Sequence, residues 1–69
     1  MADTLGDALP REMTRVRDEV MPPYMEIGQA GQFALAMMRA DLDRAAKALA
    51  EGDVVAMIAV YASLKEYHV

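Results

Sequence analysis

A chain of 69 residues can form one domain (here residues 1–69), and a domain this small usually needs disulfides, a metal or oligomerisation for stability. Because there is no cysteine and His68 is the only histidine, disulfides and the usual zinc ligand sets are excluded, and we expect no metal, no cofactor and a homodimer. A net charge of −4 argues against direct nucleic-acid binding. No apolar run approaches the roughly 20 residues that span a bilayer, so membrane insertion is not expected.

The first predicted element is a helix over about residues 10–21. Residues 1–8 show little apolar periodicity and are expected to be flexible. Pro10 suits the first turn of a helix, where its missing N–H is not needed. A single apolar stripe follows at helical spacing, made of Leu9, Met13, Val16 and Val20. On the other face Arg15 and Glu19 are four residues apart and can pair.

A joint is predicted after this helix. Pro22 and Pro23 lack a backbone donor and disfavour a helical conformation in the preceding residue, so the first helix should end or kink near Met21. With Gly28 and Gly31 close behind, residues 22–31 are interpreted as a turn-rich connection that includes at most one helical turn.

Two further helices are predicted over about residues 31–51 and 54–67. The heptad spacing that marks the second helix is formed by Leu35, Met38, Leu42, Ala45 and Leu49. Gly52 suits the left-handed position after its end, and Asp53 suits the N-cap of the next helix. So short a connection folds the two helices back as an antiparallel pair. The predicted fold class is therefore all-α, a two- to three-helix hairpin with a kinked first helix.

The third predicted helix is apolar on every side. From Val54 to Ala62 the only polar side-chain group is the Tyr61 hydroxyl. The stripe expected to face the second helix is Val54, Met57, Tyr61 and Leu64. The remaining apolar surface needs another cover, which a homodimer would supply. The predicted dimer interface is Val55, Ile58, Val60, Tyr61 and Ala62. The alternative is a monomer in which the kinked first helix folds over this face.

No arrangement of side chains points to catalysis, so an enzyme is not expected. Ser63 and His68 are five residues apart near a helix end, which does not place them side by side. Asp41 and Asp43 are two apart and point in different directions on a helix.

Binding to another protein is the predicted role, and the second helix offers candidate contact residues. Met37 falls outside the heptad seam, and methionine and arginine are frequent in adaptable interfaces. The predicted partner-binding residues are Met37, Arg39, Ala40, Arg44 and Lys47. Two alternatives stay open: Met37 can pack against the first helix or the second copy, and Arg39 and Asp41 can be ordinary solvated charges.

Four segments of the sequence resemble small proteins encoded in the early regions of temperate bacteriophages, most closely the phage quorum-sensing anti-activators. They are Glu26–Gly31, Phe33–Leu42, Ala45–Met57 and Tyr61–Lys65. The resemblance implies a dimeric helical protein in the host bacterial cytoplasm that binds and inhibits a LuxR-type transcriptional activator. It also implies inhibition of a type IV pilus assembly ATPase, which would cause superinfection exclusion. The alternatives are an antidefence protein that binds a nuclease and a structural module that dimerises through helices.

Overall fold

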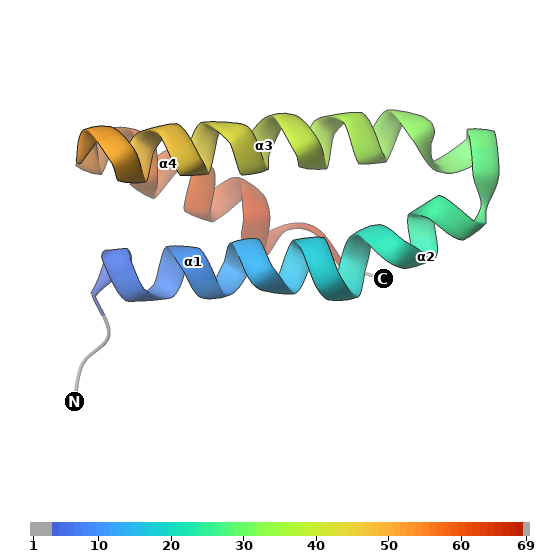
Figure 1. Cartoon of the computed structure of the whole chain (residues 1–69), viewed down its shortest axis with the longest axis horizontal. Helices are drawn as coiled ribbons and strands as arrows, with labels where there is room; N and C mark the ends of the chain where they lie inside the picture. Colours follow the sequence, from blue (N-terminus) through green and yellow to red (C-terminus); the bar gives the residue numbers. More distant parts are fainter. Residues whose placement is uncertain (1–3, 69) are drawn as a thin grey trace.

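The computed structural model describes residues 4–68, and every regular element in that range is helical. In chain order the elements are α1 (Leu5–Arg15), the π-helical η1 (Val16–Val20), α2 (Met21–Glu26), the 3-10 helix η2 (Gly28–Gly31), α3 (Gln32–Glu51) and α4 (Val54–Lys65). The segments α1, η1 and α2 form one rod that runs alongside α3, and α4 crosses obliquely behind both (Figure 1). The prediction of an all-α fold is confirmed for this part of the chain.

Helix α1 begins five residues earlier than the sequence analysis predicted. The Thr4 hydroxyl accepts a hydrogen bond from the backbone N–H of Asp7 at 3.2 Å and donates one to its carboxylate at 3.0 Å, which caps the helix. Pro10 consequently lies inside α1. Its ring is exposed, and the helix lacks one backbone N–H donor at this position. Residues 4–8 are therefore ordered, and the prediction of flexibility is wrong for them; residues 1–3 lie outside the described range.

The prolines do not end the first helix. The chain changes to π geometry over η1, where the Met21 N–H donates to the Val16 carbonyl five residues back. Pro22 and Pro23 then occupy the first turn of α2, in which a helix does not need their missing donors. Helical structure consequently continues to Glu26, so the expected end or kink near Met21 is replaced by a one-turn π segment.

The connection between the rod and α3 is very tight. Gly31 is buried, and a Cβ atom at that position would lie 2.1 Å from the Tyr24 carbonyl oxygen. Only glycine allows the 3-10 turn of η2 to pack so closely against α2. This approach reverses the chain direction within a few residues and sets the rod beside α3, as Figure 1 shows at the turn between α2 and α3.

The α3–α4 connection is made by two residues with local signals. Gly52 has φ 66° and follows the last turn of α3, where the Asp53 N–H donates to the Ala48 carbonyl at 3.0 Å. The Asp53 carboxylate accepts a hydrogen bond from the Ala56 N–H at 3.1 Å and so caps α4. These bonds satisfy backbone groups that both helix ends would otherwise leave unpaired.

The core lies where the rod, α3 and α4 meet. Its buried side chains are Leu9, Val16, Val20, Met21, Leu35, Met38, Ala45, Ala48, Met57, Val60 and Leu64. Each large member contributes roughly 1.5–3 kcal/mol through burial. Helix α1 contacts both α3 and α4, so three helices close one core.

Candidate protein-binding surface

One face of α4 is apolar and lies in solvent. Val55 is 79% exposed and Ile58 is 57% exposed, although both side chains are fully apolar. Ala59 and Ala62 are also exposed and share this side of the helix, because positions three or four apart are neighbours on a helix. We call these four residues, Val55, Ile58, Ala59 and Ala62, the α4 outer face. Among the described residues they form a continuous apolar surface without an intramolecular cover.

Two residues of the predicted dimer interface do not belong to this face. Val60 is 1% exposed and belongs to the core, so its assignment to the dimer interface is wrong. Tyr61 is half-buried, and the Lys65 ammonium lies 5.3 Å from the centre of its ring. Residues two apart on a helix point in nearly opposite directions. Ile58 and Val60 therefore cannot both face a second copy.

The first helix covers only part of α4. It contacts α4 on the side that buries Val60 and Leu64, whereas Val55 and Ile58 on the other side stay exposed. The alternative expectation that the first helix folds over α4 therefore accounts for the core side of α4 but leaves the α4 outer face uncovered.

Four of the five predicted partner-binding residues share one side of α3. All four are exposed, and they follow one another at intervals of three, four and three positions. They are Met37, Ala40, Arg44 and Lys47. We call these four the α3 stripe. Arg39 is also exposed, but it lies two positions from Met37 and therefore about 200° around the helix. Arg39 lies about 80° from Lys47 and about 100° from Ala40, so it borders the stripe on one side and is remote from Met37.

Phe33 extends the α3 stripe and was missed by the sequence analysis. Its ring is 77% exposed, the highest value among the large hydrophobic residues after Val55. It lies four residues before Met37 and so on the same side of α3. The helical spacing alone could have found it, because positions 33, 37, 40 and 44 repeat at intervals of four, three and four.

A groove of about 380 Å³ connects the α3 stripe with the α4 outer face. Its lining comes from both helices and consists of Arg44, Lys47, Ala48, Glu51, Asp53, Ala56 and Ala59. The alanines give it small apolar walls, while Arg44 and Lys47 supply positive charge and Glu51 and Asp53 supply negative charge. Ala59 belongs to both the groove and the outer face, so the two surfaces border each other.

A buried carboxylate lies next to the α3 stripe. The Asp41 side chain is 12% exposed, accepts a hydrogen bond from the Tyr67 hydroxyl at 2.7 Å and lies 3.4 Å from the Arg44 guanidinium. Burial, this hydrogen bond and the Asp41 charge together raise the pKa of Tyr67 to about 12. Asp41 is therefore not the solvated charge that the sequence left open. Its spacing from Met38 and Ala45 would have placed it on the buried side.

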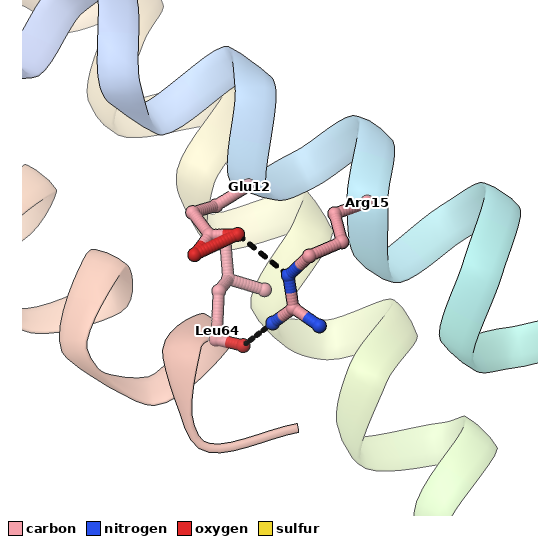
Figure 2. Close-up of polar contacts among 3 residues, drawn as sticks. All are labelled: Glu12, Arg15 and Leu64. Atoms are coloured by element: carbon pink, nitrogen blue, oxygen red, sulfur yellow. Dashed lines mark hydrogen bonds and ion pairs between the residues drawn. The ribbon is translucent and has the colours of Figure 1, made fainter. Parts of the chain in front are cut away.

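Arg15 fixes the end of α4 against α1. Figure 2 shows its guanidinium between two acceptors, the Glu12 carboxylate at 2.7 Å and the Leu64 carbonyl oxygen at 3.0 Å. A positive charge at the last turn of a helix also interacts favourably with the helix dipole. The sequence analysis considered Glu19 as the partner of Arg15. The π turn of η1 begins directly after Arg15 and removes the regular four-residue alignment on which that pairing depended.

Within residues 4–68 there is no group of three or more His, Asp or Glu side chains that could hold a metal ion. The Ser63 hydroxyl donates to the Ala59 carbonyl at 3.4 Å, and the backbone carbonyl of His68 accepts from the Tyr24 hydroxyl at 3.3 Å. Across the same part of the chain, none of the helices has the length and apolar character required to cross a membrane.

No family model, no curated protein and no solved structure matches this chain.

Proposed function

We propose that this protein acts by binding other proteins, as a homodimer that uses the α4 outer face for self-association and the α3 stripe for its target. The exposure of Val55 and Ile58 carries this proposal. Leaving either side chain in water forgoes roughly 1.5–3 kcal/mol of burial. Contiguous exposed apolar surfaces of this kind mark interaction sites.

The α3 stripe supports a second, more polar contact. It combines a flexible methionine with two positively charged side chains at the edge of a groove, and arginine is frequent among residues that dominate binding energy. A partner helix with an apolar side chain for the groove, carboxylates for Arg44 and Lys47, and a basic side chain for Glu51 and Asp53 would complement it. The protein would then inhibit its target by occupying a surface, with no reaction of its own.

For the target we propose a LuxR-type transcriptional activator of the host, and in addition a type IV pilus assembly ATPase. This part of the proposal rests on the sequence resemblance to phage quorum-sensing anti-activators. The acidic net charge argues against general DNA binding by the protein itself. Its effect on transcription would therefore come from binding the activator.

The test is a direct binding titration between the purified full-length chain and a purified LuxR-type activator, followed by a reporter assay. The double variant Arg44→Glu with Lys47→Glu should weaken binding at least tenfold, because it reverses two charges at the groove. Arg39→Glu is the matched control, since Arg39 is exposed on another side of α3.

Two outcomes would contradict the proposal. Loss of binding with Arg39→Glu but not with the double variant would place the target surface on the other side of α3. No binding to the activator or the pilus ATPase, together with rescue of a phage on a host that carries a nuclease defence, would replace the target with a nuclease.

A further inference from the structure

We infer that two copies of this protein pack through their α4 outer faces in an antiparallel arrangement, with the two-fold axis between Ile58 and Ala59. The inference rests on the proposed homodimer and adds the orientation and register of its interface. In a two-fold dimer every contact occurs twice: if position i of one copy contacts position j of the other, position j of the first copy contacts position i of the second. An axis at this point therefore places position 55 opposite position 62 and position 58 opposite position 59.

The sizes of the side chains favour this register. The α4 outer face has two large residues, Val55 and Ile58, and two small ones, Ala59 and Ala62. The antiparallel register sets each large side chain of one copy against an alanine of the other. A parallel register would set valine against valine and alanine against alanine, which leaves gaps beside the alanines. Because protein interfaces pack as densely as interiors, the alternation of large with small is the better fit.

The charges at the two ends of α4 favour the same orientation. Asp53 is the N-cap of α4, Glu51 ends α3 just before it, and Lys65 lies in the last turn of α4 with the ammonium 5.3 Å from the Tyr61 ring centre. An antiparallel pair brings Lys65 of one copy to Glu51 and Asp53 of the other. A parallel pair would instead bring both copies of Glu51 and Asp53 together, beside both copies of Lys47, and align two helix dipoles.

In this register Glu66 of one copy lies opposite Glu51 of the other, which is a like-charge pair. Lys47 lies there on the rim of the groove, in the same lining as Glu51 and Asp53. Each end of the interface therefore contains two lysines, one from each copy, beside the acidic groups. Three carboxylates and two lysines leave each antiparallel end with one excess negative charge, against two at the acidic end of a parallel pair.

Cysteine cross-linking tests the register. The chain has no cysteine of its own, so only the introduced cysteines can form disulfides. In the antiparallel register two copies of position 55 are about 10 Å apart along the helix axis, beyond the reach of a disulfide. We therefore expect that Val55→Cys alone and Ala62→Cys alone give no dimeric cross-link under mild oxidation. A mixture of the two variants, carrying different tags, should give the mixed disulfide. Met25→Cys, exposed on α2, is the control for random collision.

Each other result overturns a defined part of the inference. A strong cross-link of Val55→Cys with itself would show a parallel interface. A dimer in sedimentation without any cross-link above the Met25→Cys control would show a different interface. A monomer of the unmodified chain at high micromolar concentration would refute the homodimer in the proposed function as well.

A charge exchange gives an independent measurement. Lys65→Glu should weaken dimerisation by roughly two- to tenfold, as expected for exposed ion pairs. Adding Glu51→Lys to the same chain should restore most of the loss, because the two positions exchange charges across the antiparallel interface. A double variant that is no tighter than Lys65→Glu would contradict the proposed pairing.

Discussion

At the scale of single residues, the best-defined polar contact is between Asp41 and Tyr67. It joins the middle of α3 to the second residue after α4, across 26 positions of the chain. A buried carboxylate is costly unless its oxygens are hydrogen-bonded. The Tyr67 hydroxyl donates such a bond and the Arg44 guanidinium forms an ion pair at 3.4 Å, so the contact holds the C-terminal residues against α3.

Tyr67→Phe removes the hydroxyl and leaves the aromatic ring in place. We expect a loss of about 1 kcal/mol in the free energy of unfolding, because the bond to the Asp41 carboxylate is lost but the site is only half-buried. Urea unfolding at neutral pH measures this difference. A variant as stable as the original chain would show that water replaces the hydroxyl at no cost.

The same pair predicts a dependence on high pH. Folding raises the pKa of Tyr67 from its ordinary 10.0 to about 12, so the fold favours the neutral phenol. The resulting stability is fully present below pH 10 and is lost as the pH rises through about 12. The stability difference between the original chain and Tyr67→Phe should therefore shrink between pH 10 and pH 12, measured by urea unfolding at each pH. A constant difference would contradict the assignment.

At the scale of elements, the joint between α2 and α3 depends on one close approach. Neither proline breaks the rod, because the backbone changes to π-helical geometry in η1, just before Pro22. The direction of the chain changes only at the Gly28–Gly31 turn, where Gly31 meets the Tyr24 carbonyl. The position of α3 relative to the rod is therefore set at Gly31.

Gly31→Ala should destabilise the protein by about 2–3 kcal/mol, because its Cβ would lie 2.1 Å from the Tyr24 carbonyl oxygen and the turn would have to open. Thermal unfolding followed by circular dichroism measures the loss. Gly6→Ala is the matched control, since its Cβ would lie 3.6 Å from the Thr4 hydroxyl and an alanine within a helix stabilises by about 0.5 kcal/mol. Equal effects at the two positions would show that the joint is not tight.

At the scale of the whole molecule, the division of α4 into a buried and an exposed side separates folding from association. Met57, Val60 and Leu64 close the core with α1 and α3, and the α4 outer face stays available to a second copy. Substitutions on the two sides should consequently have different effects.

Ile58→Asp should abolish the dimer and leave a folded monomer, because Ile58 is 57% exposed within one chain. The matched substitution Val60→Asp should prevent folding, since it would bury an unpaired carboxylate at a cost of several kcal/mol. Sedimentation gives the association state and circular dichroism gives the fold. A dimeric Ile58→Asp variant would show that the α4 outer face is not the interface.

Local signals in the sequence were sufficient for several features. The helical spacing from Leu35 to Leu49 and the Gly52–Asp53 pair predict α3, its end and the start of α4. Such signals act through bonds between residues a few positions apart, so they do not require the rest of the fold. The earlier start of α1 also has a local cause, the bonds between Thr4 and Asp7, which the sequence analysis did not use.

Only the tertiary structure decided which side of α4 is buried and where Asp41 and Arg15 find their partners. A helix that is apolar on every side has no periodicity to distinguish Ile58 from Val60, so the packing of α4 against both α3 and α1 makes the choice. Likewise, the bonds from Tyr67 to Asp41 and from Arg15 to the Leu64 carbonyl cross 26 and 49 positions. The sequence determined the helices and their caps through local chemistry, whereas the candidate binding surface is what remains exposed after distant helices have packed.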